Sequence, residues 1–331
     1  MALKGQRVLI TGGTGSFGKA FAKRLLTEGE CQTVCIFSRD EWKQWEMKES
    51  DPTFSGSNIR YFLGDIRDKD RLRRAFHEVD LIVHAAALKQ VPAAEYNPTE
   101  FIKTNVTGTM NVIDAALETG VKKVIALSTD KAVNPINLYG ATKLCADKLV
   151  VAANSYVGKR GYPLFSVVRY GNVLGSRGSI IPYWKELIAK GVKQLPITDR
   201  NMTRFWISLD DAVEFVLRSF ERMYGGEIFV PKVPSMKIID LAEAIAPDLE
   251  KKIIGIREGE KLHELLISQD DAPHTLAYEG FYLIAPHTIK RHPTLWEKFL
   301  QASAKPVPKG FSYTSDNNPV MLSTKEILDI I

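Results

Sequence analysis

Apolar positions follow two different spacings through the first two-thirds of the chain. Short runs rich in β-branched residues predict strands at residues 8–10, 34–37, 59–63, 81–83, 124–127 and 165–168. Apolar residues at helical spacing predict helices at residues 19–26, 70–76, 106–118 and 138–153. Repeated alternation of strand and helix is typical of an α/β fold in which a doubly wound parallel sheet carries helices on both faces.

This regular pattern stops after Gly175, and the chain up to about residue 204 contains glycine, proline and isolated apolar residues. Ser208 and Asp211 have the spacing of a capping box and predict the start of a helix; a further helix is predicted at residues 239–245. A polar, proline-rich tail follows. We therefore expect a large domain from residues 1–174, to which residues 205–233 return, and a smaller α/β lobe from residues 175–204 and 234–331.

Composition places the chain among globular proteins, since 45% of its 331 residues are hydrophobic and 25% are charged. Lys and Arg number 44 against 39 Asp and Glu, and the net charge of +5 is spread along the chain. This distribution favours an acidic small molecule over nucleic acid as a ligand, although it also fits an ordinary solvated surface.

Three cysteines, Cys31, Cys35 and Cys145, lack the spacing of a zinc site, and no charged-then-apolar signal segment opens the chain. No apolar run approaches the roughly 18 residues that a membrane-spanning helix needs. We therefore expect reduced thiols, no bound metal, no membrane association and a cytoplasmic location.

Three glycines, Gly12, Gly15 and Gly18, directly follow the first predicted strand and open the first helix. Glycine suits such a turn because the backbone must bend tightly, approach a pyrophosphate and pack the helix closely on the sheet. The spacing differs from the commoner G-x-G-x-x-G, but its position between strand and helix indicates a Rossmann-like dinucleotide-binding domain. The predicted cofactor contacts in this turn are Gly12, Thr14, Gly15, Ser16, Phe17 and Gly18.

The second predicted strand ends at Ser38, Arg39 and Asp40, where an NAD-dependent enzyme would place a carboxylate against the ribose 2′-hydroxyl. Arg39, with Ser38 and Lys43, suits a 2′-phosphate instead, because guanidinium and phosphate form charge-assisted hydrogen bonds. We therefore predict NADP as the cofactor. Asp40 could be the ribose carboxylate, but its position favours the N-cap of the next helix. Further cofactor contacts are expected after the third and fourth strands, at Asp65, Ile66, Ala85, Ala86 and Lys89.

Tyr139 and Lys143 are four residues apart and therefore share one face of their predicted helix. A nearby ammonium and a positive nicotinamide ring lower the pKa of a phenol, so that tyrosinate can take a proton from a sugar hydroxyl. Thr129, Asp130 and Lys131 lie at the end of the fifth predicted strand and add an acid and a base to this pair. Together the five residues predict catalysis beyond a simple oxidation.

His84 lies inside an apolar predicted strand. A histidine in that position is more often a packed core residue than a catalytic one. We therefore interpret His84 as structural.

Four motifs, at residues 127–135, 137–143, 169–173 and 259–264, together carry a family resemblance that covers nearly the whole chain. The chain resembles the extended short-chain dehydrogenases/reductases and, within them, the nucleotide-sugar 4,6-dehydratases. More narrowly, these motifs are similar to those of C5-inverting UDP-N-acetylglucosamine dehydratases, which begin pseudaminic acid synthesis for flagellin glycosylation.

The resemblance implies a role for each residue at the fifth strand. Tyr139, with Lys143 beside it, takes the C4 hydroxyl proton, and Thr129 hydrogen-bonds the same oxygen. Lys131 stands where most sugar-nucleotide dehydratases have glutamate and is implied as the C5 base, while Asp130 protonates the leaving C6 hydroxyl. Lysine is a base only when neutral, which burial and neighbouring positive charge would favour. The implied product is UDP-2-acetamido-2,6-dideoxy-β-L-arabino-hex-4-ulose.

The same resemblance implies that the smaller lobe binds UDP-N-acetylglucosamine and that the protein forms a homo-oligomer, of which a hexamer is one form. Lys261 and His263 are expected to shape the nucleotide end of the site, and Asn105 to orient Tyr139 through the backbone or a water molecule. The implied substrate contacts are Lys89, Asn172, Arg177, Ser179, Thr198, Arg204, Arg257 and Glu260.

Three other functions remain as alternatives. A UDP-N-acetylhexosamine epimerase would use the same fold and first oxidation but would form no C6 methyl group. A retaining 4,6-dehydratase would share the Asp130 and Lys131 pair, although such enzymes typically carry membrane helices. A non-catalytic dinucleotide sensor would not need Thr129, Asp130, Lys131, Tyr139 and Lys143 together.

Overall fold

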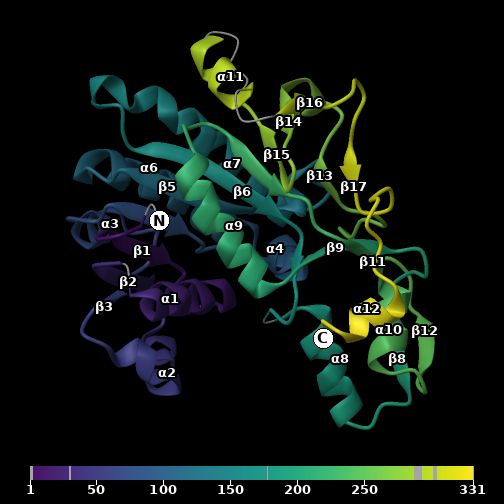
Figure 1. Ribbon diagram of the computed structural model, residues 1–331. Helices are drawn as coiled ribbons and strands as arrows, with labels where there is room; N and C mark the ends of the chain where they lie inside the picture. The colour runs from purple at the N-terminus through teal and green to yellow at the C-terminus, as the bar shows by residue number, and fades with distance from the viewer. Residues whose placement is uncertain (1–2, 30, 177, 287–292, 301–303, 331) are drawn as a thin grey trace.

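A large parallel sheet forms the centre of the computed structural model, which describes residues 3–29, 31–176, 178–286, 293–300 and 304–330 (Figure 1). Its parallel strands are β1 (Arg7–Thr11), β2 (Thr33–Ser38), β3 (Ile59–Leu63), β4 (Leu81–His84), β5 (Lys123–Thr129), β6 (Leu164–Tyr170) and β10 (Ile228–Pro231). They lie in the order β10-β6-β5-β4-β1-β2-β3, in which the direction of winding reverses between β1 and β4. This order confirms the predicted doubly wound α/β fold.

The strands predicted from apolar runs are β1 to β6. Most extend a residue or two beyond the apolar run, because the ladder of backbone hydrogen bonds continues into polar residues such as Thr11 and Thr129. The carboxyl ends of parallel strands meet at one edge of a sheet, so Gly12, Ala85 and Asp130, which follow β1, β4 and β5, lie at the same edge.

Helices cover both faces of the sheet. One face carries α1 (Ser16–Glu28), which packs against α9 (Leu209–Arg222). The other carries α3 (Lys69–Ala75), α6 (Gly108–Thr119) and α7 (Leu138–Ala152), which pack side by side. These helices confirm the predicted periodic segments, and the Ser208 hydroxyl accepts the Asp211 N–H at the start of α9.

The helix α2 (Glu41–Ser50) was predicted only through its N-cap, Asp40, and not from apolar periodicity. Its only buried side chains are Gln44 and Met47, so no apolar stripe marks it. Asp40 caps its first turn by accepting the Lys43 N–H at 3.0 Å, which confirms the N-cap interpretation of that residue.

A π-helical segment, Ile102–Thr107, joins α5 (Pro98–Phe101) to α6 and contains Asn105. The short α4 (Val91–Tyr96) precedes it. Single π-helical turns are uncommon and occur frequently at functional sites. The described 3₁₀ helices are η1 (Pro52–Ser55), η3 (Asp130–Ala132), η4 (Ala153–Tyr156), η5 (Gly158–Arg160) and η6 (Ala272–His274).

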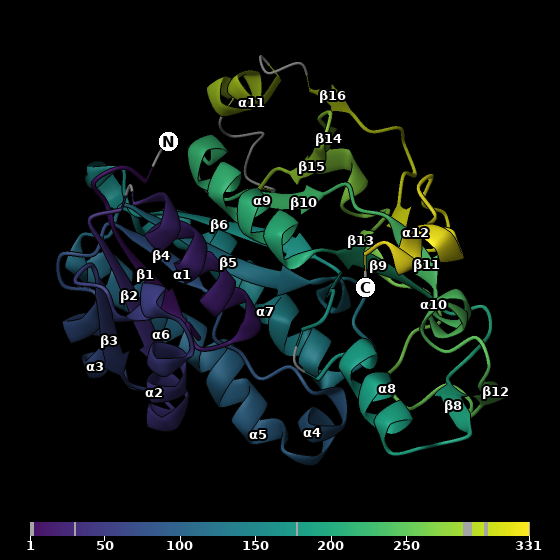
Figure 2. The same cartoon turned by 60° about the horizontal axis from the view of Figure 1, so that its bottom comes forward.

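A second group of elements lies beyond the carboxyl edge of the sheet (Figure 2). It contains three small sheets: β7 (Asn172–Val173) with β9 (Thr203–Ile207) and β11 (Ser235–Lys237), β8 (Gln194–Ile197) with β12 (Glu250–Ile253), and β13 (Leu265–Ile267) with β17 (Tyr313–Thr314). Its helices are α8 (Ile180–Ala189), α10 (Ile238–Ile245) and α12 (Thr324–Leu328). Trp184, Trp206, Met236 and Leu241 form the centre of a separate apolar core there.

The C-terminal part of the chain also contributes to the large sheet. β15 (Phe281–Ile284) pairs antiparallel with β10, followed by β14 (Thr275–Ala277) and β16 (Lys305–Pro306). The expected domain division assigned all of residues 234–331 to the smaller lobe; these strands return to the sheet because Leu276 and Leu283 are buried in its core. The helix α11 (Pro293–Leu300) lies beside them.

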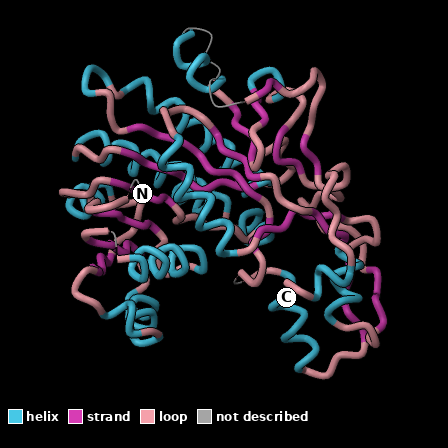
Figure 3. Tube along the Cα trace, viewed as in Figure 1, coloured by secondary structure: helices cyan, strands magenta, loops and turns pink. Residues whose placement is uncertain are grey.

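Loops are most extensive on the side of the smaller lobe, where for example residues 254–264 connect β12 to β13 (Figure 3). None of the described helices combines the length and the apolar character that crossing a membrane requires.

Candidate active site

The turn between β1 and α1 has the geometry of a dinucleotide-binding cradle. Gly12 has φ +68, and a Cβ there would lie 2.9 Å from the Cα of Ala86, so only glycine brings the turn so close to the chain after β4. A Cβ on Gly18 would lie 2.6 Å from the Cα of Gly13, which seats α1 against the turn. Gly15 caps α1 with no side-chain hydrogen bond, so the helix can offer N–H groups to a phosphate. The residues present therefore fit a bound dinucleotide.

The end of β2 carries the side chains predicted to meet a 2′-phosphate. Arg39 is exposed, whereas the Lys43 ammonium lies 2.9 Å from the Asp40 carboxylate. The Ser38 hydroxyl is buried and accepts a hydrogen bond from Gln44 Nε2 at 3.0 Å. Arg39 is therefore the most open cation of the predicted set.

The other predicted cofactor residues surround the same edge of the sheet. Asp65 lies after β3 and pairs with Arg67 at 2.8 Å, while Ile66 is buried against Gly108. Lys89 follows β4, and both desolvation and the charge of Lys131 lower the pKa of its ammonium. Lys89 thus lies within electrostatic reach of the fifth-strand residues.

His84 is fully enclosed at the end of β4. Its Nδ1 lies 2.8 Å from Thr11 Oγ1 and its Nε2 lies 3.1 Å from Thr109 Oγ1. Burial lowers the pKa of His84 to about 3, so the ring is neutral. The structure confirms its interpretation as a packed residue.

Tyr139 and Lys143 are both buried on the first two turns of α7. Burial raises the pKa of Tyr139 to about 12, while the Lys131 ammonium and the Thr129 hydroxyl oppose this rise. Burial lowers the pKa of Lys143, whose ammonium donates to the Leu127 carbonyl at 2.7 Å. Without a bound cofactor, the phenol is therefore protonated at neutral pH.

Two backbone features fix α7 against η3. Asn137 caps the helix by accepting the Gly140 N–H at 2.7 Å. A Cβ on Gly140 would lie only 2.1 Å from the carbonyl oxygen of Lys131, so no larger residue fits at this contact. The importance of Gly140 is not visible in the sequence, because the clash arises from two segments that meet only in the fold.

Asn105 connects the π-helical segment to the loop after β4 and to α7. Its side chain accepts the Leu88 N–H and donates to the Leu88 carbonyl, both at 2.9 Å. It also donates to the Thr142 hydroxyl at 3.0 Å, and Thr142 donates to the Tyr139 carbonyl at 2.8 Å. Asn105 is thereby linked to the turn of α7 that carries Tyr139.

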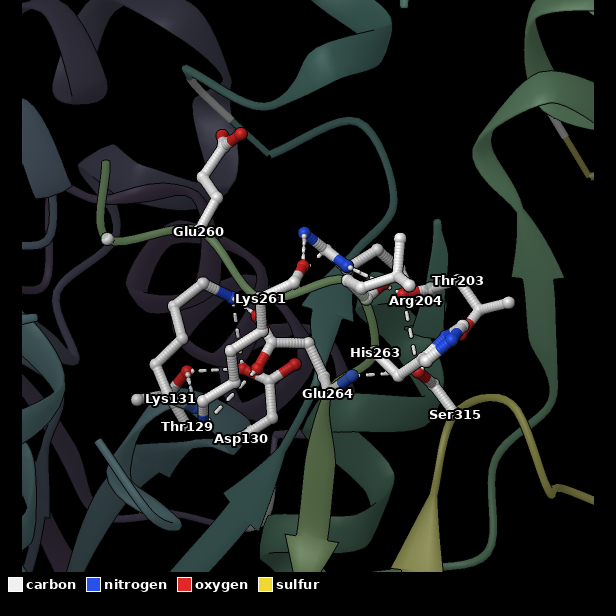
Figure 4. Close-up of polar contacts among 12 residues, drawn as sticks. Thr129, Asp130, Lys131, Thr203, Arg204, Glu260, Lys261, His263, Glu264 and Ser315 are labelled. Atoms are coloured by element: carbon white, nitrogen blue, oxygen red, sulfur yellow. Dashed lines mark hydrogen bonds and ion pairs between the residues drawn. The ribbon is translucent and has the colours of Figure 1, made fainter. Parts of the chain in front are cut away.

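Thr129, Asp130 and Lys131 form a tight polar cluster at the end of β5 (Figure 4). The Thr129 hydroxyl donates to Asp130 Oδ1 at 2.8 Å, and the Lys131 ammonium donates to the same oxygen at 3.1 Å. The Asp130 side chain is fully buried, and its Oδ2 has no hydrogen-bond partner among the described residues. The Lys131 side chain is 25% exposed and is therefore the open face of the cluster.

A second carboxylate, that of Glu264, approaches Lys131 from the segment before β13. Its Oε1 lies 3.2 Å from Lys131 Nζ. Burial disfavours the ammonium of Lys131, but the Asp130 and Glu264 carboxylates outweigh burial and raise its pKa. This differs from the expectation that burial and positive neighbours would leave Lys131 neutral, because two carboxylates lie within 3.2 Å of its ammonium.

Glu264 ends the segment Gly259–Glu264, which we call the crossing segment because it runs from the smaller lobe over η3 and the start of α7. Asn137 Nδ2 donates to the Gly259 carbonyl at 2.7 Å, and Lys261 Nζ donates to the Val133 carbonyl at 2.6 Å. The motif at residues 259–264 carries the family resemblance but predicts no role for Glu264. Its position directly before a short apolar run, in a motif already singled out, was the available signal.

Arg204 and His263 hold the other side of the crossing segment. Arg204, expected among the substrate contacts, is buried and directs its Nη atoms to the carbonyls of residues 203, 261 and 262. His263 Nδ1 lies 2.8 Å from the Thr203 hydroxyl, which also meets Ser315. Figure 4 shows Arg204 and His263 to the right of the cluster, whereas the Glu260 side chain points away from the cluster.

The remaining predicted substrate residues come from several elements of the smaller lobe. Ser179 caps α8, and its buried hydroxyl has no partner among the described residues. Arg257 is largely exposed and lies 4.0 Å from Glu260. Asn172 is half-buried on β7, and Thr198 is buried after β8. Arg177 lies outside the described residues.

Comparisons with known proteins agree with this geometry. The family model described as "Polysaccharide biosynthesis protein" matches residues 8–286. A Campylobacter jejuni protein named UDP-N-acetylglucosamine 4,6-dehydratase (inverting) is 58% identical over 99% of this chain and 97% of its own length. A Rickettsia prowazekii protein named UDP-glucose 4-epimerase is 40% identical over 98% of this chain and 94% of its own.

Solved structures agree as well. The structure of Pen from Bacillus thuringiensis has a TM-score of 0.89 and 36% identity, and covers 100% of this chain and 98% of that one. A dTDP-glucose 4,6-dehydratase from Streptomyces venezuelae, at 24% identity and a TM-score of 0.69 over 77% of this chain and 86% of that one, shares the fold. These findings confirm the resemblance carried by the four motifs: the chain belongs to the polysaccharide biosynthesis protein family of extended short-chain dehydrogenases/reductases.

Proposed function

We propose that this protein is an NADP-dependent 4,6-dehydratase that converts UDP-N-acetylglucosamine to the C5-inverted UDP-2-acetamido-2,6-dideoxy-β-L-arabino-hex-4-ulose. The observation that carries the proposal is the contact of Lys131 with Asp130 at 3.1 Å beside Tyr139. Elimination of water needs a base at C5 and an acid at the C6 hydroxyl, and this pair supplies both. The name of the relative with 58% identity supports the same reaction.

In the proposed reaction, Tyr139 takes the C4 hydroxyl proton, and Thr129 donates a hydrogen bond to that oxygen. Lys143 lowers the pKa of the phenol through its positive charge. A dinucleotide held by the glycine cradle of Gly12, Gly15 and Gly18 would supply the hydride acceptor for C4 and the hydride donor for C6. The ketone at C4 acidifies the C5–H bond, which Lys131 then breaks as a base.

Lys131 must lose its ammonium proton before it can act, and Asp130 must gain one before it can act. A single transfer from Lys131 Nζ to Asp130 satisfies both requirements, and the 3.1 Å hydrogen bond between them supports it. Substrate that covers the exposed face of Lys131 would exclude water and weaken the ion pair relative to the neutral pair. Reprotonation of C5 from the opposite face then gives the inverted product.

A second candidate, a UDP-sugar 4-epimerase, is favoured by the relatives of 40% identity that carry that name. An epimerase needs the C4 oxidation but no acid for a C6 hydroxyl. The fully buried Asp130 beside Lys131 has no role in that reaction, so the cluster favours dehydration.

The remaining parts of the proposal concern ligands and setting. Residues 1–174 and 205–233 bind NADP, and the smaller lobe binds the UDP moiety through Asn172, Ser179, Thr198, Arg257 and Glu260. We further propose that the enzyme works as a cytoplasmic homo-oligomer and starts pseudaminic acid synthesis. The Ser179 hydroxyl at the N-terminus of α8 is buried and has no hydrogen-bond partner within the part of the chain that the structure describes, which supports a phosphate position there.

The cofactor proposal makes a prediction about Arg39. Arg39→Ala removes the exposed guanidinium and should weaken NADP binding by about 10-fold or more while NAD binding changes by less than about 2-fold. Titration of both dinucleotides by fluorescence measures this difference. Arg60→Ala, a change of the same kind on β3, serves as the control. Equal weakening for the two cofactors would contradict a 2′-phosphate contact.

Proton NMR of UDP-N-acetylglucosamine incubated with the enzyme in heavy water tests the reaction itself. We expect a new C6 methyl signal, deuterium at C5 and ring couplings of the inverted sugar. An epimer without a methyl signal would replace the proposal with the second candidate. No reaction with this sugar, in protein that binds the dinucleotide, would overturn the proposed substrate.

A further inference from the structure

Glu264 is a buried carboxylate that faces three cations. Only 2% of its surface is exposed. Its Oε1 lies 3.2 Å from Lys131 Nζ and 3.9 Å from Arg204 Nε, and its Oε2 lies 3.9 Å from Lys261 Nζ. Because Glu264 lies behind Lys131 and away from solvent, it does not reach a substrate directly.

The contacts of Asp130 differ from those of Glu264. Among the described residues, Asp130 forms an ion pair with Lys131, feels the Lys261 ammonium at longer range, and accepts a hydrogen bond from the Thr129 hydroxyl. Glu264 is balanced by Arg204 and Lys261 even when Lys131 is neutral. A proton that leaves Lys131 therefore meets less opposing positive charge at Asp130 than at Glu264.

The Asp130–Lys131 pair shares one proton, and two effects favour the loss of this proton to solvent. Burial and positive neighbours favour its loss from Lys131 to solvent, which would leave an amine and an ionised Asp130. Such a pair has a base but no acid. The charged and titratable groups that face Lys131 are Asp130, Glu264, Arg204, Lys261, Lys89 and Tyr139.

We propose that Glu264 is a positioning residue whose negative charge retains the shared proton on the Asp130–Lys131 pair, and this rests on the proposed dehydration. The proton passes from Lys131 Nζ to Asp130, and from Asp130 to the C6 hydroxyl, which leaves as water when the C6–O bond breaks. The Lys131 amine takes the C5 proton as the C5–C6 double bond forms. The pair thus returns to ammonium and carboxylate, with Glu264 ionised throughout.

Glu264→Gln tests the proposal because it removes the charge and keeps the size of the side chain. In the pH profile of turnover at saturating substrate, the alkaline limb is the region where the rate falls as the pH rises. We expect the alkaline limb of Glu264→Gln to lie about one pH unit or more below that of the parent. The KM for the nucleotide sugar should change by less than about 2-fold. Glu258→Gln, an exposed position shortly before the crossing segment, is the matched control and should keep the parental profile.

A parental alkaline limb in Glu264→Gln, with or without a lower overall rate, would overturn the proposal, since a merely structural role scales the rate without moving the limb. If Glu264→Gln does not fold, Glu264→Asp replaces it. That variant keeps the charge but places it farther from Lys131, so the alkaline limb of its pH profile should lie at lower pH than that of the parent. An alkaline limb at the same pH as in the parent would overturn the proposal.

A labelling measurement on the substrate-free protein separates this inference from the proposed function. The Lys131 side chain is 25% exposed, so a small amine-selective reagent can reach it, and only the neutral amine reacts. At pH 8, mass spectrometry should find Lys131 labelled about 10-fold faster in Glu264→Gln than in the parent or in Glu258→Gln. Equal labelling rates would overturn the role of Glu264, whereas faster labelling in an enzyme that does not dehydrate this sugar would overturn only the substrate.

Discussion

Burial disfavours the charged form of each titratable side chain of this site. The neighbouring charges decide whether the pKa shifts in the direction that burial favours. Lys143 and Lys131 are both enclosed lysines, yet the pKa of Lys143 is lowered and that of Lys131 is raised. The difference comes from the two carboxylates of Asp130 and Glu264, which lie within 3.2 Å of Lys131. The same rule applies to Glu227, a buried carboxyl that forms no ion pair with any cation among the described residues.

Glu227 predicts a pH dependence of stability. Its side chain is fully buried before β10, and burial raises its pKa to about 7 from an ordinary value of 4.5. A raised pKa favours the protonated folded state, so this contribution is complete below pH 4.5 and is lost as pH rises through 7. Between pH 5 and pH 8.5, the free energy of unfolding of the parent should fall by up to about 3 kcal/mol more than that of Glu227→Gln. The variant therefore gains stability relative to the parent as the pH rises.

Urea denaturation of both proteins at pH 5 and pH 8.5 measures this difference. Glu46→Gln, which changes an exposed carboxylate on α2, controls for the loss of a charge and should follow the parent. The same change in unfolding free energy between the two pH values in the parent and in Glu227→Gln would contradict the raised pKa.

At the scale of elements, the site depends on how closely α7 approaches η3. Asn137 caps α7 and also donates to the crossing segment, so one side chain sets both the start of the helix and the position of Gly259. The missing side chain of Gly140 then lets the helix lie against the Lys131 carbonyl. Tyr139 and Lys131 are brought together by these backbone contacts.

Gly140→Ala should disturb the site strongly. The added methyl group would lie 2.1 Å from a backbone oxygen, so α7 and η3 must separate. We expect turnover to fall by about 100-fold, because a displacement near 1 Å costs about that factor, and stability to fall by about 1–3 kcal/mol. Gly280→Ala, where a Cβ meets nothing within 4 Å, should keep parental activity. Parental turnover in Gly140→Ala would show that this spacing does not govern catalysis.

Burial, and contacts between residues far apart in the chain, explain how much of the fold and the site the sequence could predict. Apolar runs predicted β1 to β6 because these strands, apart from the partly exposed β3 at the sheet edge, are largely buried. The helix α2 was signalled only by its N-cap Asp40, because it buries only Gln44 and Met47. The site residues on β5 and α7 were recognisable from their motifs. Glu264 was not, because its meaning depends on a contact with Lys131 that lies 133 positions away in the chain, 264 − 131.

Across the whole molecule, the crossing segment carries contacts from one lobe to the other. Its start carries Glu260, which pairs with Arg257 and with it is proposed to bind the nucleotide, and it ends at Glu264 beside Lys131. Lys261 and Arg204 hold its middle through backbone carbonyls. The nucleotide end and the reacting end of a bound sugar would therefore contact different parts of one short segment.

Arg257→Ala tests whether these two ends have separate tasks. The side chain is 54% exposed and makes one weak ion pair, with Glu260 at 4.0 Å, so its removal should leave the fold and the Lys131 cluster unchanged. If Arg257 binds the diphosphate, the KM for the nucleotide sugar should rise by about 10-fold or more while kcat stays within about 2-fold. Steady-state kinetics of Lys252→Ala, an exposed cation on β12 of the same lobe, provides the control. A fall in kcat with an unchanged KM would instead mean that Arg257 acts on the reacting end, and that the crossing segment does not divide binding from chemistry.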